Sequence, residues 1–399
     1  MDPFDALALE QLRTRQSIKW RRFEADVLPL WVAEMDVLLA DPVREVLERA
    51  LRDGDTGYPG VTPYAEALAG FAAERWGWSG LDPARTALVA DVMTGVSEAV
   101  RLVTGPGATV VVSPPVYPPV YPPFFGYLED AGREVLEAPL GADGRLDLDA
   151  LAEAFARATA GGRGAAYLLC SPHNPTGVVH TADELAGLAD LARAADVRVV
   201  ADEIHAPLVL DGPGFVPYLA VDPAGISVTS ASKAWNLAGL KAAVVVAGPD
   251  AADDLARLPE VATHGPSHLG VLGHTAALQH GGPWLDDVLA ALRSRRELLG
   301  TLLAEHLPQV RWTPPRATFL AWLDCAGLGL TGTYADRPAP RGVMNADVGP
   351  ARAFLDRSRV GLAAGTAFGT GGLDHVRLTL ATSTEVLTEA VTRMGRVSG

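Results

Sequence analysis

The sequence predicts an α/β fold built on a doubly wound, mostly parallel sheet. Between about residues 41 and 282, short β-rich apolar runs alternate with longer stretches of helical periodicity, which is typical of parallel strands joined by helices. Two of these runs, 165–169 and 197–201, are followed at once by polar clusters, as expected where strands carry a ligand site at their carboxyl ends. A chain of 399 residues can bury a full core and form more than one lobe.

The individual elements follow from this periodicity in chain order. We expect helices at 42–52, 63–76, 97–104, 146–158, 182–195 and 251–258. We expect strands at 87–90, 109–112, 166–169, 198–201, 227–230 and 242–246. A long helix at 284–307 then leads into a second unit with strands near 319–323 and 375–379. Residues 331–347 are rich in glycine, proline and charge, which predicts an inserted loop.

Composition and charge exclude several classes of function. A net charge of −15 opposes binding to nucleic acid. The acidic N-terminus lacks the layout of a signal peptide, no apolar stretch approaches the roughly 20 residues that span a bilayer, and the two cysteines imply no disulfide framework. We therefore expect a cytoplasmic protein that binds neither membranes nor nucleic acid. The histidines between residues 264 and 280 lack supporting carboxylate or cysteine spacing, so we expect no metal site.

The most informative feature is a lysine placed among hydroxyl residues. Lys233 follows the apolar run 226–229 and lies beside Ser230 and Ser232, ahead of a glycine-containing turn. Such a lysine can form a Schiff base with an aldehyde, while nearby hydroxyls and main-chain N–H groups hold a phosphate. Lys233 is therefore the candidate catalytic residue.

Two polar residues upstream of the lysine complete a candidate cofactor site. Asn174 and Asp202 each follow an apolar run, which places them at the carboxyl ends of predicted parallel strands. In combination with Lys233 they suit a pyridoxal ring: Asn174 can donate to the ring hydroxyl oxygen and Asp202 can pair with the ring nitrogen.

A phosphate needs several N–H and O–H donors, preferably at the start of a helix. The segment 94–97 follows a predicted strand and opens the helix expected at 97–104. The residues predicted to hold the phosphate are Gly95, Val96, Ser97, Ser230, Ser232 and Lys241.

Seven motifs in order resemble the fold-type I, class I/II pyridoxal-5′-phosphate (PLP) enzymes, and among them the MalY/PatB subgroup of cystathionine β-lyase-like carbon–sulfur lyases. The motifs lie at 17–20, 28–36, 57–58, 172–177, 202–205, 230–241 and 376–378. The resemblance implies an aspartate aminotransferase-like fold with PLP as cofactor. It also implies a large PLP-binding domain at 41–282 and a discontinuous small α/β domain at 1–40 and 283–399.

The resemblance assigns further residues to the cofactor. Tyr58 matches a tyrosine that reaches the phosphate of the neighbouring subunit, which implies a homodimer with shared active sites. One aromatic residue stacks on the ring, and a tandem duplication leaves two candidates, Tyr117 and Tyr121, with a narrow preference for Tyr121 because it precedes a helix that begins at a proline. Ile204 packs on the opposite ring face. His205 either contacts the ring hydroxyl or is packed at the strand end.

The substrate side of the site is also implied by the resemblance. Arg377 matches an arginine that pairs bidentately with an α-carboxylate. Trp31 and Ala33 belong to the N-terminal pocket segment, where the subgroup more often has aspartate than Glu34. Other departures lie at 363–365, where Ala-Ala-Gly replaces Asn-Pro-Gly, and at Thr379, which replaces an expected asparagine.

The implied reaction is a carbon–sulfur β-lyase reaction on a small amino acid. Lys233 would take the Cα proton, a thiolate would leave Cβ, and pyruvate and ammonia would follow. The departures on the substrate side leave open whether cystathionine or another L-cysteine S-conjugate is cleaved. An aminotransferase shares every cofactor residue and is the main alternative, followed by a decarboxylating enzyme that acts on a cysteine S-conjugate. A PLP-binding regulator is not supported, because no DNA-binding module is visible.

Overall fold

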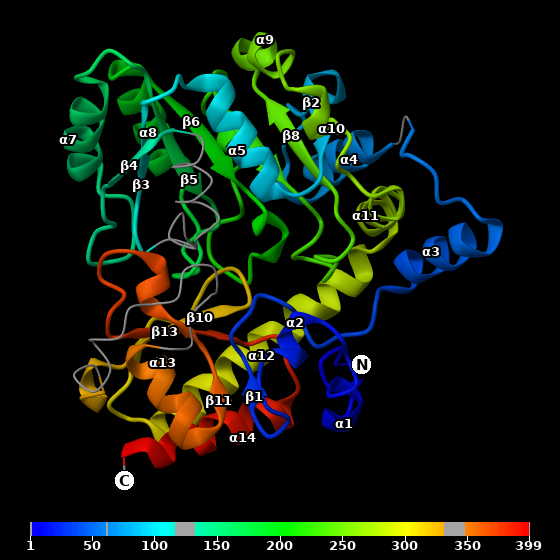
Figure 1. The fold of residues 1–399 in the computed structure, drawn as a ribbon, viewed down its shortest axis with the longest axis vertical. Helices are drawn as coiled ribbons and strands as arrows, with labels where there is room; N and C mark the ends of the chain where they lie inside the picture. The colour runs from blue at the N-terminus through cyan, green and yellow to red at the C-terminus, as the bar shows by residue number, and fades with distance from the viewer. Residues whose placement is uncertain (1, 61–62, 116–131, 331–347, 399) are drawn as a thin grey trace.

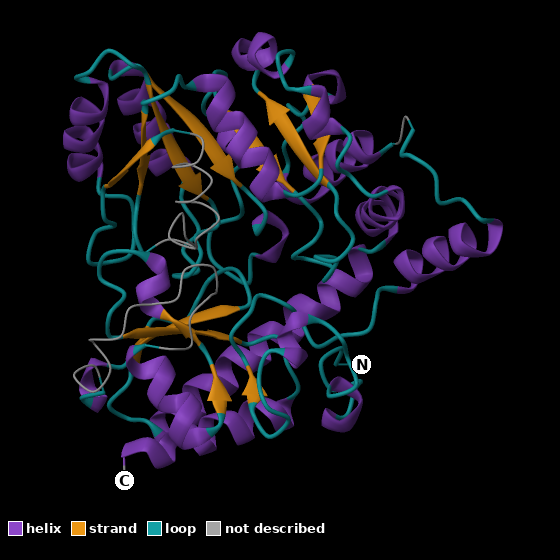
Figure 2. Ribbon diagram, viewed as in Figure 1, coloured by secondary structure: helices purple, strands orange, loops and turns teal. Residues whose placement is uncertain are grey.

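The computed structural model describes residues 2–60, 63–115, 132–330 and 348–398. The predictions for Tyr117, Tyr121 and a loop at 331–347 lie outside these residues. Figures 1 and 2 show a large sheet flanked by helices in one half of the molecule and smaller sheets with helices in the other. Within the described ranges, no helix is both long and apolar enough to cross a membrane.

The helices and strands have the following bounds. The helices are α1 (Leu9–Leu12), α2 (Ile18–Arg21), α3 (Asp41–Asp53), α4 (Tyr64–Trp76), α5 (Val92–Val103), α7 (Leu148–Thr159), α8 (Ala182–Ala194), α9 (Ala252–Leu255), α10 (Glu260–Thr263), α11 (His268–His280), α12 (Gly282–His306), α13 (Gly349–Ala353) and α14 (Thr384–Gly395). The strands are β1 (Leu28–Pro29), β2 (Thr86–Val89), β3 (Thr109–Val112), β4 (Glu134–Glu137), β5 (Ala165–Cys170), β6 (Val197–Asp202), β7 (Ile226–Thr229), β8 (Ala243–Ala247), β9 (Arg311–Trp312), β10 (Leu320–Asp324), β11 (Val360–Gly361), β12 (Ala363–Ala364) and β13 (His375–Thr379).

The large sheet has seven strands in the order β2-β8-β7-β6-β5-β3-β4. Every neighbouring pair is parallel except the two pairs that contain β8, which runs antiparallel to β2 and β7. The prediction of a mostly parallel α/β sheet is therefore confirmed. Because β5, β6 and β7 run parallel, they end at the same edge of the sheet, which is where a ligand site is expected.

Both faces of this sheet are covered, as the alternation within β3 illustrates. Val110 and Val112 pack in a cluster with the apolar face of α5, whereas Val111 packs in a cluster with residues of α7 and α8. Since successive side chains of a strand point to opposite faces, α5 covers one face and the pair α7 and α8 covers the other. This arrangement leaves the strand ends as the place where polar residues can converge.

The second half of the molecule combines N-terminal and C-terminal residues. Strands β12, β13, β10 and β9 form an antiparallel sheet, and β1 pairs in parallel with β11 through Leu28↔Val360. Helix α12 leads from the large sheet into this half (Figure 1). The domain boundaries near residues 41 and 283 stay a prediction.

Two predicted helices differ from the structure by more than two residues at one end. Helix α5 begins at Val92 rather than near Ser97, because the Asp91 side chain caps it by accepting from the Thr94 N–H at 2.8 Å. The helix expected at 251–258 is shorter, since α9 ends at Leu255 and a new helix begins after Pro259. Proline disfavours the helical conformation of the residue before it, which explains the break.

Candidate active site

The candidate site is a pocket at the edge where β5, β6 and β7 end. Cys170 and Asp202, the last residues of β5 and β6, lie directly opposite each other in the sheet. The pocket is lined by Ala33, Asp91, Val92, Met93, Cys170, Asn174, Asp202, Ile204, His205, Ser232, Lys233, Ala238, Leu240, Lys241 and Ala242. The lysine loop, the two strand ends and the N-terminal segment thus meet in one place, although they are far apart in the sequence.

Lys233 lies in the loop after β7, and its amine is largely enclosed. The Nζ donates to the carbonyl oxygen of Ala33 at 2.9 Å. Burial and the positive charge of Arg377 lower the pKa of Lys233 to about 8, although the negative charge of Asp202 acts in the opposite direction. An amine with this pKa is partly neutral near physiological pH and can act as a nucleophile or a base.

Asp202 ends β6 and is almost fully buried. Burial raises the pKa of this carboxyl to about 6, against the opposing effects of a hydrogen bond from the Ile204 N–H at 3.1 Å and the charge of Lys233. The carboxylate is therefore mainly ionised at pH 7. A buried anion of this kind is suited to pair with a cationic ring nitrogen.

Arg377 comes from β13 in the other half of the molecule and is completely buried. One guanidinium nitrogen donates to Asn174 Oδ1 at 3.2 Å, and another donates to the Trp31 carbonyl oxygen at 3.1 Å. The guanidinium also lies over the Phe368 ring, 5.0 Å from its centroid. The arginine therefore joins the end of β5 to the N-terminal segment, next to the pocket.

The first turn of α5 reaches the pocket through Val92 and Met93, not through the predicted residues of this helix. A Cβ on Gly95 would lie 2.6 Å from Val228 Cγ1, so that residue faces the sheet. Val96 is fully buried in the core and Ser97 is also buried. Gly95, Val96 and Ser97, which were predicted to hold the phosphate, do not line this pocket, and the start of the helix was predicted about one turn too late. Asp91 caps the Thr94 N–H, and the N–H groups of Val92 and Met93, which have no acceptors within the helix, remain suited to an anion.

Only some of the hydroxyl and amine groups that were predicted to bind a phosphate line the pocket. Ser232 and Lys241 line the pocket, whereas the Ser230 hydroxyl donates to the Ala242 carbonyl oxygen at 2.7 Å and does not line it. The half-exposed Lys241 amine lies 2.7 Å from Asp91 Oδ2. Hydrogen bonds from Lys241 and Thr94 outweigh burial and lower the pKa of Asp91. Sequence reasoning missed this aspartate, although an Asp-x-x-Thr pattern after a strand is a helix-capping signal.

Ile204 and His205 both line the pocket, and their predicted contacts with a cofactor ring stay a prediction. The His205 ring packs edge-on against Phe319, with centroids 6.1 Å apart. Burial, together with the charges of Lys233 and Arg377, holds the pKa of His205 well below its usual value, so the imidazole is neutral.

The remaining predicted residues lie at different distances from the pocket. Ala33 lines it, and Trp31 contributes a carbonyl oxygen to Arg377. The Tyr58 side chain is 90% exposed and is not part of this pocket within its own chain. Over the described ranges, no group of three or more histidine, cysteine, aspartate or glutamate residues is placed to hold a metal ion.

Comparison with known proteins assigns the chain to a family. A family model described as aminotransferase class I and II matches residues 26–394. The chain belongs to this family. It is 55% identical to a Mycobacterium tuberculosis protein named "Putative cystathionine beta-lyase", with 99% of this chain and 98% of that protein covered. It is 33% identical to cystathionine beta-lyase PatB of Bacillus subtilis, with 96% and 97% covered.

A solved structure of a protein from Corynebacterium diphtheriae has the same fold. It is described as a "putative plp-dependent beta-cystathionase", and it matches this chain with a TM-score of 0.84, 32% identity and 98% of both chains covered. The resemblance to class I/II enzymes of the MalY/PatB subgroup is therefore confirmed.

Proposed function

We propose that the protein is a PLP-dependent carbon–sulfur β-lyase that cleaves cystathionine or another L-cysteine S-conjugate to a thiol, pyruvate and ammonia. The observation that carries the proposal is the enclosed Lys233 amine, which shares one pocket with Asp202 and Asn174. The full-length matches to proteins named cystathionine beta-lyase support this reaction within the family.

The pocket residues fit the cofactor. PLP requires an amine for its aldehyde, an acid for its ring nitrogen and N–H donors for its phosphate, and the pocket offers Lys233, Asp202 and the first turn of α5 with Ser232. When bound, PLP supplies an electron sink that stabilises negative charge on the Cα of an amino acid. Lys241 brings its ammonium group to the start of α5, where it is paired with Asp91.

The protein's own residues bind the substrate and move its proton. With a pKa of about 8, the Lys233 amine can accept the Cα proton of the substrate and donate a proton again at a later step of the reaction. Arg377 lies beside the pocket residue Asn174, and two of its guanidinium nitrogens donate to neutral acceptors on Asn174 and Trp31. A carboxylate is a stronger acceptor than either carbonyl oxygen, so an α-carboxylate can compete for this arginine. Once Cα carries negative charge, a thiolate at Cβ is a good leaving group.

We also propose that the enzyme is a homodimer in which Tyr58 enters the partner's active site. Tyr58 lies between α3 and α4, and α3 projects from the body of the molecule (Figure 1). Large apolar side chains are exposed in the same region, with Leu38 57%, Leu51 61% and Tyr58 90% exposed. Several large apolar side chains exposed on one projecting segment are typical of a protein interface.

We further expect the enzyme to work in the cytoplasm. Both cysteines, Cys170 and Cys325, are buried and unpaired, which supports a reducing compartment.

The decisive experiment offers the purified enzyme cystathionine, several S-substituted cysteines and alanine, each with and without a keto-acid acceptor. The proposal expects thiol and pyruvate from the sulfur compounds without an acceptor, and no turnover of alanine. Keto acid that appears only when an acceptor is added, without any thiol, would show an aminotransferase instead. Release of carbon dioxide and an aldehyde that retains sulfur would show the decarboxylating alternative.

A further inference from the structure

The segment 31–36, between β1 and α3, supplies main-chain acceptors to two cationic groups, Arg377 and Lys233. The Trp31 carbonyl oxygen accepts from Arg377 at 3.1 Å, and the Ala33 carbonyl oxygen accepts from Lys233 at 2.9 Å. The position of this segment therefore decides where the amine and the guanidinium are held. A displacement of about an ångström would weaken both hydrogen bonds.

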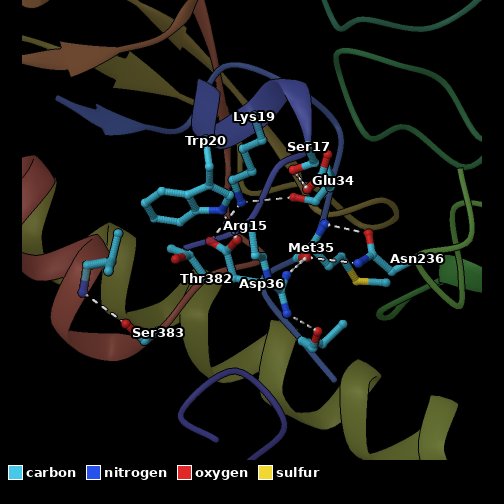
Figure 3. Close-up of polar contacts among 12 residues, drawn as sticks. Arg15, Ser17, Lys19, Trp20, Glu34, Met35, Asp36, Asn236, Thr382 and Ser383 are labelled. Atoms are coloured by element: carbon cyan, nitrogen blue, oxygen red, sulfur yellow. Dashed lines mark hydrogen bonds and ion pairs between the residues drawn. The ribbon is translucent and has the colours of Figure 1, made fainter. Parts of the chain in front are cut away.

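A fully buried ion pair holds the far side of this segment (Figure 3). Lys19 Nζ lies 2.7 Å from Asp36 Oδ2, and neither side chain is exposed to solvent. The same Nζ donates to the Glu34 carbonyl oxygen at 3.0 Å, and Trp20 Nε1 donates to Asp36 Oδ1 at 3.0 Å. Residues of α2 thus bind the segment at Glu34 and Asp36. The Glu34 carbonyl group is one peptide away from the Ala33 carbonyl group that accepts from Lys233.

The near side of the segment is bonded to the lysine loop. Asn236, three residues after Lys233, accepts from the Met35 N–H at 2.8 Å and donates to the Met35 carbonyl oxygen at 2.9 Å. Asn236 has a φ of 57°, a conformation that asparagine adopts more readily than most residues. The segment is therefore fixed between α2 on one side and the loop that carries Lys233 on the other, as Figure 3 shows for Met35.

We propose that Lys19 and Asp36 are positioning residues for the active site, which hold segment 31–36 so that the Ala33 carbonyl oxygen meets the amine of Lys233. The proposal rests on the proposed function for its catalytic meaning. A buried ion pair contributes little net stability compared with apolar residues of the same volume, so stability alone does not account for it. What the pair adds here is a directed bond from Lys19 to the main chain of the segment.

The test replaces both partners at once with Lys19→Met and Asp36→Asn. Removing only one charge would leave the other buried and uncompensated and endanger folding, whereas the double variant removes both charges, keeps the side-chain volumes and retains an oxygen for Trp20 Nε1. The protonation of Lys233 is then measured in the cofactor-free protein, from the pH dependence of its acetylation by trace acetic anhydride, read by mass spectrometry. Because a carbonyl acceptor favours the ammonium form, its displacement should lower the Lys233 pKa by about one pH unit. In the cofactor-loaded enzyme, kcat should fall about tenfold or more.

Arg295→Met is the matched control. Arg295 is a buried cation that pairs with Asp2 and Asp5 near the N-terminus, and it does not contact segment 31–36. This variant should lower the melting temperature and leave the Lys233 pKa unchanged. An unchanged or raised Lys233 pKa in the double variant, or an equal shift in the control, would overturn the proposal. Since the titration needs neither cofactor nor turnover, its result stands apart from the outcome of the lyase assay.

Discussion

Replacing Lys233 with methionine should make the cofactor-free protein more stable at neutral pH. Enclosure in the pocket and the charge of Arg377 lower the pKa of this lysine from 10.5 to about 8. Each pH unit corresponds to about 1.4 kcal/mol, so holding the ammonium here at pH 7 costs about 3 kcal/mol. Because the amine faces a pocket that water can enter, we expect the variant to gain about 2 kcal/mol of unfolding free energy.

The gain in unfolding free energy of the Lys233→Met variant should decrease as the pH rises. Below pH 8 the lysine carries its proton in both the native and the unfolded state, so the cost is fully present. Between pH 8 and 10.5 the native state releases a proton that the unfolded chain retains, and wild-type stability rises with pH. The advantage of the methionine variant should therefore shrink over this interval.

Urea unfolding of the cofactor-free proteins, followed by circular dichroism at pH 7, 8.5 and 9.5, measures both effects. Lys241→Met is the control, because it also removes one positive charge but from a half-exposed amine that is paired with Asp91. The Lys241→Met variant should show no comparable increase in unfolding free energy at pH 7. A Lys233→Met variant that is less stable than wild type at pH 7, by an amount independent of pH, would refute the reasoning.

Three further predictions concern the loaded enzyme and its assembly. The purified protein should be yellow, and borohydride reduction should attach the cofactor to Lys233 and to no other lysine. The Lys233→Ala variant should lose activity by ~10²-fold or more while it still binds the cofactor. Cofactor affinity, measured by fluorescence titration, should fall between pH 7 and pH 5, because Asp202 takes up a proton near pH 6 and no longer pairs with the ring nitrogen; a flat profile would contradict that role. Mixing Tyr58→Phe with Lys233→Ala subunits should restore activity, since each heterodimer contains one intact site, and no recovery after proven subunit exchange would count against a shared site.

The sequence was sufficient for the residues at the strand ends. Asn174, Asp202 and Lys233 each follow an apolar run, and parallel strands end at one edge, so their convergence follows from the pattern of the chain. The start of α5 was placed too late, because the Val92–Thr94 turn resembles the end of a strand in sequence. Only the cap formed by the Asp91 side chain on the Thr94 N–H shows where the helix begins.

The sequence by itself determined the α/β class, the order of the strands along the chain and the polar residues that meet at the strand ends. The fold class and the strand order depend on local periodicity. The polar residues were recognisable because few residue types can form a Schiff base or pair with a pyridoxal ring. Only the tertiary structure showed that Arg377, Asn174 and Trp31 meet across more than 300 residues of chain, and that α2 holds segment 31–36 against the lysine loop. The bonds of that segment run through main-chain carbonyl oxygens, which every residue has, so no side-chain pattern could reveal them.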